Sequence, residues 1–275
     1  MFLLSHIRKY DWVLASAVFS LMLLGLVSLF SMSGIKPIHF FERQLMWATV
    51  GVCMLVLSSM VDFRLFRTQS TAVLALYGIV IALLLLVISS SFVIRGVKSW
   101  LTFGGFSVEP VELVKLALII LLAKFFSKRH VEIYRIRHLI VSGIYAALPA
   151  LLVLLQPDLG SAIILVAIWV SVVIFSGMKL RHLMLLVCIF ALLSFAGWHS
   201  VLKPYQKSRI VTFLDPYRDP KGAGYQMLQS MIAVGSGRVW GKGLGYGSQP
   251  HLPFLPEAEP EFIFAAFVEE WGFAG

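Results

Sequence analysis

Residues 12–34 read WVLASAVFSLMLLGLVSLFSMSG, and this run without a charged side chain is long enough to cross a bilayer as a helix. Arg8 and Lys9 precede it. The run is longer than the apolar core of a signal peptide, and it has no clear small-residue cleavage site. We therefore expect a first membrane-spanning helix that is retained as an anchor.

The rest of the chain has the same character. Hydrophobic residues make up 59% of the sequence and charged residues only 13%, against about 25% in soluble domains. Cys53 and Cys188 both lie inside apolar runs, which offers neither a disulfide framework nor a metal-ligand spacing. The net charge of +9 does not indicate nucleic acid, because the basic residues fall in short loops, where membrane lipid and topology account for them.

Apolar runs of spanning length recur along the chain, and they predict an all-α polytopic membrane protein that forms a single integral membrane domain over residues 1–275. After residues 12–34 they lie at about 44–61, 70–94, 110–126, 138–155, 159–177 and 182–200. A further apolar segment begins at Phe262. We expect seven transmembrane helices and the start of an eighth, with a long loop at about residues 201–261 between helices seven and eight.

Alternate loops differ in positive charge, and this difference predicts the orientation, since short cytoplasmic loops retain Lys and Arg. The loops on one side contain Arg8, Lys9, Arg64, Arg67, Lys124, Lys128, Arg129, Arg135, Arg137, Lys179 and Arg181. The short loops on the other side contain only Lys36, Arg43, Arg95 and Lys98. We expect a cytoplasmic N-terminus and an extracytoplasmic loop at residues 201–261.

The extracytoplasmic loop is rich in glycine and contains one apolar stretch, YQMLQSMIAV at residues 225–234. This stretch is too apolar to stay in water and too short to span, so we expect it to lie in the membrane interface or to re-enter the membrane. GKGLGYG at residues 241–247 matches neither GxGxxG nor a P-loop, which argues against a nucleotide site.

Glu112 and Lys115 are three residues apart and share one face of the predicted helix that Glu109 and Pro110 begin. A charged pair inside a spanning segment is costly and usually faces a cavity or the interior of the bundle, which makes it a candidate functional site. A structural salt bridge is the alternative.

Asp158 lies in QPDLG, where proline again stands at a predicted helix start with an acid beside it. A functional role and a simple helix cap are both open. By the alternation of the spans, the outer half of the bundle holds Lys98, Trp100, Glu112, Lys115, Asp158, Glu257, Glu259 and Glu261. We expect these acids and bases to converge on one pocket.

The acids Glu257, Glu259 and Glu261 alternate directly before the apolar segment that begins at Phe262. Ionised groups resist leaving water, so beside a membrane segment they must be solvated, paired or used. A solvated loop end is the alternative to a functional site.

Three basic residues of the extracytoplasmic loop, Arg209, Arg218 and Lys221, suit a phosphate or anionic headgroups. Ordinary positive charge over a bilayer surface is the alternative.

Four blocks of the chain resemble the SEDS family (shape, elongation, division, sporulation), whose members include RodA and FtsW. They are GVKSWLTFGGFSVEPVELVKL at residues 96–116, LLQPDLGSA at 154–162, RIVTFLDPYRDPKGAGYQMLQSMIAVGSGRVWGKGLGYGSQ at 209–249 and FLPEAEPEFIFAAFVEEWGFAG at 254–275. They occur in order and with the expected topology.

The resemblance implies a peptidoglycan glycosyltransferase that polymerises lipid II at the outer face of the bacterial cytoplasmic membrane and works with a class B penicillin-binding protein. It implies substrate-binding roles for Trp100, Glu112, Lys115 and Asp158, and a catalytic role for Glu261. A flippase for a lipid-linked precursor and a non-catalytic scaffold for a partner synthase are the alternatives. The resemblance leaves open whether the protein serves elongation or division.

Three departures from the family pattern matter. Members usually have QPSE where this chain has EPVE at residues 109–112, and HTDF where it has EPEF at 259–262, so that Glu261 replaces an aspartate. The family has ten spans, whereas this sequence stops at Gly275 within the eighth, which indicates a truncation and puts the activity of this chain in question.

With the substrate that the resemblance supplies, the α-linked donor and the β-linked product require one in-line displacement and one general base for the acceptor 4-hydroxyl. Glu261 is our candidate for that base, with Glu257 and Glu259 as competitors. Lys115 and Arg209 are our candidates for neutralising the leaving group. A divalent cation is left open as a cofactor.

Overall fold

The structure is a computed structural model that describes residues 11–32, 39–60, 64–89, 100–103, 106–127, 136–200, 204–222, 224–247 and 262–275. The chain divides into two compact units. Unit 1 combines residues 1–60 with residues 197–275, and unit 2 is the continuous segment 61–196. Unit 1 is therefore built from the two ends of the sequence.

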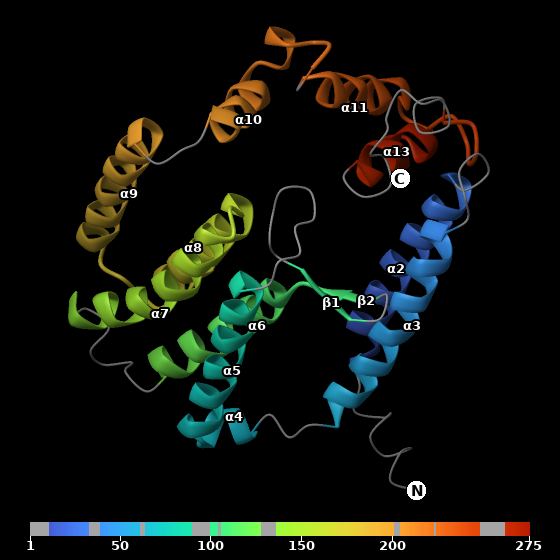
Figure 1. Cartoon of the computed structure of the whole chain (residues 1–275). Helices are drawn as coiled ribbons and strands as arrows, with labels where there is room; N and C mark the ends of the chain where they lie inside the picture. Colours follow the sequence, from blue (N-terminus) through green and yellow to red (C-terminus); the bar gives the residue numbers. More distant parts are fainter. Residues whose placement is uncertain are drawn as a thin grey trace, which may run out of the picture. The chain divides into compact units, whose positions relative to one another are not determined.

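Unit 2 is a helical bundle. Its central helices, which lie side by side in Figure 1, are α5 (Ser70–Ser89), α6 (Pro110–Ser127), α7 (Ile136–Leu155) and α8 (Leu159–Phe175). The short helix α4 (Arg64–Thr68) contacts α5 and α6. Helix α9 (Leu180–Ser200) adds Leu186 to the core of the bundle.

Helix α6 owes its central place to a stripe of apolar side chains. Val111, Val114, Leu118, Leu122 and Phe125 recur every three or four residues, so they line one face of the helix, and all five are buried. Because lipid is as apolar as these side chains, close packing rather than escape from water holds such helices together.

Helices α7 and α8 pack closely because α7 presents small residues. Ser142, Gly143 and Ala146 follow one another along α7, Ser142 and Ala146 are buried, and the ring of Trp169 from α8 lies against Gly143. The indole nitrogen of Trp169 donates a hydrogen bond to the Ser142 hydroxyl over 3.0 Å. A Cβ at Gly143 would approach the indole to 3.3 Å, so this position requires a very small residue.

The prediction of an all-α chain needs one correction. Strands β1 (Leu101–Phe103) and β2 (Phe106–Val108) form a two-stranded antiparallel sheet, with Leu101 paired to Val108 and Phe103 paired to Phe106. Gly-Gly is a strong signal for a β-hairpin turn, and Gly104-Gly105 stands between the two strands in the sequence.

Unit 1 contains the apolar helices α2 (Trp12–Met32) and α3 (His39–Ser59), which contact each other. The segment predicted as the extracytoplasmic loop contributes α10 (Pro204–Leu214), the 3-10 helix η1 (Pro216–Arg218) and α11 (Tyr225–Ser236). Helix α13 (Ile263–Trp271) packs against α11 and α2.

Every predicted span coincides with a helix among the described residues. Five of these helices, α2, α3, α5, α7 and α9, are long and apolar enough to cross a membrane. Helix α8 is a shorter apolar helix, and α6 carries the charged residues Glu112, Lys115 and Lys124. The chain is therefore a polytopic membrane protein, and the count of seven spans stays a prediction.

Candidate functional site

The β-hairpin brings Trp100 next to the start of α6. Because Leu101 pairs with Val108, the flanking residues Trp100 and Glu109 both stand at the open end of the hairpin. Pro110 then begins α6, as predicted, since proline is well suited to a first helical position. Trp100 and Glu109 are both half-buried.

The first turns of α6 carry the predicted ion pair. The Lys115 Nζ lies 2.7 Å from the Glu112 Oε1, which confirms that the two side chains meet on one face of the helix. The side chain of Glu112 is 62% exposed and that of Lys115 only 20%. The lysine is therefore held against the bundle, while the carboxylate faces outward.

Asp158 caps the neighbouring helix. It is the N-cap of α8, and its carboxylate accepts a hydrogen bond from the backbone N–H of Ser161 over 3.1 Å. Pro157 precedes the cap instead of opening the helix, which corrects the expected arrangement. Before it, the buried Gln156 donates from Nε2 to the carbonyl oxygen of Leu84 in α5 over 3.2 Å.

Glu109 links these two helix starts. Burial raises the pKa of the Glu109 carboxyl, and the nearby charges of Asp158 and Glu112 raise it further, whereas Lys115 lowers it. Asp158 must therefore lie within electrostatic reach of Glu109. The sequence indicates Glu109 only as a helix start, and no pattern in it indicates the approach of Glu109 to Asp158.

We call Trp100, Glu109, Glu112, Lys115 and Asp158 the polar cluster. It joins all four of the predicted binding residues of unit 2 with one further acid. Its carboxylates can accept hydrogen bonds from hydroxyl groups, and its ammonium group can contact an anionic oxygen. Among the described residues, no group of three His, Cys, Asp or Glu side chains could hold a metal ion.

Arg209, the predicted basic residue of unit 1, lies on α10 and lines a cavity of about 210 Å³. Phe262 lines the same cavity, together with Thr212, Phe213, Gln226 and Met227. Phe262 is the N-cap residue of α13 and directly follows Glu261 in the chain. Glu261 itself lies outside the described residues, as do Glu257, Glu259 and Lys98.

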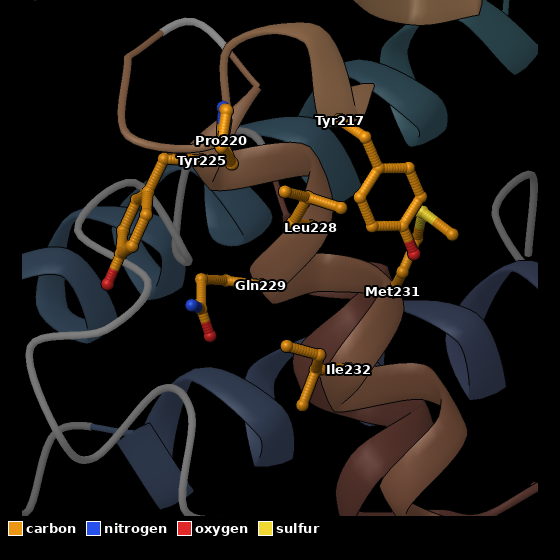
Figure 2. Close-up of a pocket in the computed structure, with 7 residues that line it drawn as sticks. All are labelled: Tyr217, Pro220, Tyr225, Leu228, Gln229, Met231 and Ile232. Carbon is orange, nitrogen blue, oxygen red and sulfur yellow. The ribbon is translucent and has the colours of Figure 1, made fainter. Parts of the chain in front are cut away.

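A larger cavity of about 430 Å³ lies along α11, the predicted interface stretch. Figure 2 shows Leu228 and Ile232 of this helix between the rings of Tyr217 and Tyr225. Its remaining lining residues are Pro220, Gln229 and Met231. The exposed basic residues Arg218 and Lys221 are sequence neighbours of Tyr217 and Pro220. An apolar hollow with adjacent cations suits an amphipathic, anionic molecule better than a free sugar.

Unit 1 contains a second set of charged residues that was not predicted from the sequence. Glu269 and Glu270 on α13 are 0% and 3% exposed, and the Nζ of Lys242 lies 2.6 Å from the Glu269 Oε1. Lys242 belongs to residues 237–247, which follow α11 and which we call the glycine-rich loop. The available signal was a pair of acids inside an apolar segment, which is costly unless both are paired.

The bundle of apolar helices, with the polar cluster at the N-terminal ends of α6 and α8, defines a membrane protein with a polar site built into its helices. The family model described as "Cell cycle protein", for FtsW, RodA and SpoVE, matches residues 11–275. The chain belongs to this family, which confirms the resemblance found in the sequence.

Relatives and solved structures agree with this assignment. Stage V sporulation protein E of Bacillus subtilis is 32% identical over 275 aligned residues, which cover 96% of this chain and 74% of that protein. The probable peptidoglycan glycosyltransferase FtsW of Tolumonas auensis is 35% identical over 272 aligned residues, with coverages of 97% and 69%. A solved structure described as "Structural coordination of polymerization and crosslinking by a peptidoglycan synthase complex" matches with a TM-score of 0.76 and 30% identity, over 97% of this chain and 73% of that one.

Proposed function

We propose that this protein is a peptidoglycan glycosyltransferase that polymerises lipid II at the outer face of the bacterial cytoplasmic membrane. The observation that carries the proposal is the family match over residues 11–275. Relatives of this chain are named as peptidoglycan glycosyltransferases, which supports it. The polar cluster adds the groups that such an activity needs within a membrane, namely hydrogen-bond acceptors for sugar hydroxyls and a cation for a phosphate.

The chemical step is an inverting displacement at the sugar carbon that bears the pyrophosphate. The acceptor 4-hydroxyl attacks this carbon, the bond to the pyrophosphate oxygen breaks, and the hydroxyl proton passes to a general base. Glu261 is the proposed base. Glu261 directly precedes Phe262 in the chain, and Phe262 lines the same cavity as Arg209, which supports this assignment.

The pyrophosphate leaves with added negative charge, which fixed cations stabilise best where water is scarce. Arg209 is the proposed cation of unit 1, and Lys115 is that of the polar cluster in unit 2. Trp100, Glu112 and Asp158 are the proposed contacts for the sugar and its hydroxyls. A divalent cation could assist the leaving group, and chelation during the assay tests for it.

The deciding experiment measures polymer formed from lipid II by the purified protein. Glu261→Gln keeps the shape of the side chain and removes the base, so it should abolish polymerisation in a protein that remains folded. Glu261→Asp should stay active because it restores the residue type of the family. If Glu261→Gln polymerises at the parent rate, Glu261 is not the base, and Glu259 or Glu257 replaces it. Transport of lipid II across vesicles without any polymer would instead favour a flippase.

The proposed partner is a class B penicillin-binding protein, which cross-links the product. The solved structure of a synthase complex supports this choice. Co-purification from membranes with division or elongation proteins would separate the two cellular roles. A scaffold would bind such a partner and form no polymer.

The proposed orientation has a cytoplasmic N-terminus and an extracytoplasmic segment at residues 201–261. Cysteines placed in residues 127–137 should resist an impermeant thiol reagent in intact cells, whereas a cysteine at Lys221 should react. The reverse pattern would overturn the orientation.

A further inference from the structure

Helix α13 ends inside a loop that completes its hydrogen bonds. The last carbonyl groups of a helix have no partner within the helix. Here the backbone N–H of Lys242 donates to the Glu269 carbonyl over 2.9 Å, and that of Gly243 donates to the Glu270 carbonyl over 3.0 Å. The loop also accepts, because Phe273 donates to the carbonyl of Arg238. Residues 238–243 are therefore bonded to the end of α13 along their length.

Two carboxylates of α13 extend the same contact through their side chains. The Glu269 Oε1 receives the Lys242 ammonium at 2.6 Å and the Ser236 hydroxyl at 3.3 Å. The Glu270 Oε1 receives the Ser31 hydroxyl of α2 at 2.6 Å and the Gly245 backbone N–H at 3.1 Å. We call Ser31, Ser236, Lys242, Gly245, Glu269 and Glu270 the α13 clasp.

The clasp fixes the position of α13 along its own axis and its rotation about that axis. An apolar contact would hold the helix at several registers, because apolar packing is not directional. Charge-assisted hydrogen bonds to Glu269 and Glu270 are directional, so a shift of one residue would separate both carboxylates from their donors. Lys242 reaches this position from the surface, with 32% of its side chain exposed, while Glu269 is fully buried.

The opposite end of this short helix leads directly into the proposed base. Phe262 is the N-cap residue, Ala266 packs against Leu29 and Met32 of α2, and Glu261 precedes Phe262 in the chain. A rigid helix of nine residues transmits a displacement of its C-terminal end to its N-terminal end. A misplacement of about 1 Å at a reacting group can lower a rate by about a hundredfold.

We propose that Lys242, Glu269 and Glu270 are positioning residues for the reaction, acting through the placement of α13 on the carboxylate of Glu261. The inference rests on the proposed function, in which Glu261 is the base. It assigns to the glycine-rich loop a role in aligning the acceptor hydroxyl with the base.

The test replaces the ion pair by apolar side chains of similar size. Removing one partner of the pair leaves a charge at a buried position, whereas replacing both is often tolerated. In the double variant Lys242→Met, Glu269→Met we expect folded protein with kcat lowered by about tenfold or more and KM within about threefold of the parent. Arg238→Gln, which alters an exposed cation on the same loop, is the matched control and should change neither constant.

A milder variant covers the case in which the double variant does not fold. Ser31→Ala removes one hydrogen bond to Glu270 and should lower kcat while KM stays near the parent value. A kcat within about twofold of the parent in every folded clasp variant would overturn the proposal, provided that Glu261→Gln is inactive. Polymerisation by Glu261→Gln at the parent rate would show that Glu261 is not the base and would overturn the positioning role of the clasp with it. Absence of polymer from the parent protein would instead overturn the proposed function itself.

A second readout does not depend on activity. Tyr246 on the loop and Phe264 on α13 are 78% and 71% exposed and can carry spin labels after Cys53→Ser and Cys188→Ser. The distance between the labels should be sharply distributed in the parent and broad in the double variant. A distribution that stays sharp and unshifted would show that the clasp does not position α13.

Discussion

The polar cluster and the α13 clasp both place carboxylates beside a lysine, but they differ in exposure. In the polar cluster, the side chain of Glu112 is 62% exposed and its contact with Lys115 joins residues of one helix. In the clasp, Glu269 is fully buried and its donors come from a loop and another helix. An exposed carboxylate can exchange its partner for a ligand, whereas a buried one is bound to its donors and holds geometry.

The energetic consequences differ in the same way. An exposed ion pair contributes about 0 to 1 kcal/mol, because water screens it. Loss of one partner from a fully buried pair costs about 3 to 5 kcal/mol, and Lys242 is partly exposed, so the clasp should fall below that range. Changes in the clasp should therefore affect folding as well as turnover, and changes in the polar cluster should affect turnover first.

The largest loss of stability should follow from a larger side chain at Gly241, where the glycine-rich loop touches the end of α13. A Cβ at Gly241 would overlap the carbonyl oxygen of Glu270, and its φ of 76° also disfavours a branched residue. We expect Gly241→Val to destabilise the protein by about 3 kcal/mol or more, seen as a lower Tm and a loss of folded protein after detergent extraction. The control Gly235→Ala, at an open helical position, should instead stabilise the protein by about 0.5 to 1 kcal/mol.

Charge reversal in the polar cluster comes next. Lys115→Glu would place a new carboxylate beside Glu112, in a cluster that already contains Glu109 and Asp158. We expect polymerisation to fall by about tenfold or more, because the variant replaces the proposed cation for the leaving group with a fourth carboxylate. Exchange of the two charges, Glu112→Lys with Lys115→Glu, should recover part of the activity. Full activity of Lys115→Glu alone would contradict the pairing.

A smaller effect concerns pH. Because the pKa of Glu109 is raised in the folded protein, folding favours its protonated form, and the resulting stability is lost as pH rises through the folded pKa. Glu109→Gln should therefore raise Tm slightly at about pH 7 and leave it nearly unchanged at about pH 4, below the ordinary glutamate value of about 4.3. Thermal unfolding at both pH values checks this. A lower Tm for Glu109→Gln at the higher pH would contradict the burial of this carboxyl.

The smallest change in stability should come from Asp158→Asn. Asparagine caps a helix about as well as aspartate, so the free energy of unfolding should change by less than about 0.5 kcal/mol, whereas Asp158→Ala should cost about 1 kcal/mol. We expect both variants to lose most polymerisation, because neither retains the charge. Full activity of Asp158→Asn would leave Asp158 as a cap alone.

Sequence patterns predicted well the features that depend only on residues close together in the chain. The apolar run at residues 110–126 became α6 at Pro110–Ser127, because its length and its apolar positions every three or four residues decide such a helix. The contact of Glu112 with Lys115 was equally accessible, since helical geometry sets the distance between residues three apart.

Contacts between distant segments were not predictable in this way. The approach of Asp158 to Glu109 depends on how α6 and α8 pack, and no spacing encodes it. The partners of Glu270 come from Ser31 and Gly245, far away in the sequence. The β-hairpin is a different case, because Gly104-Gly105 signalled its turn, although residues 95–109 were assigned to no predicted element.

The hydrogen bond between Ser31 and Glu270 joins residues 239 positions apart, so it can form only late in the synthesis of this chain. At roughly 5 to 20 residues per second, about 12 to 48 s pass between translation of the serine and of its partner. During this interval the whole of unit 2 is made, while the first two helices of unit 1 wait in the membrane without the last one. Unit 1 is therefore the last part of the described chain whose contacts are completed.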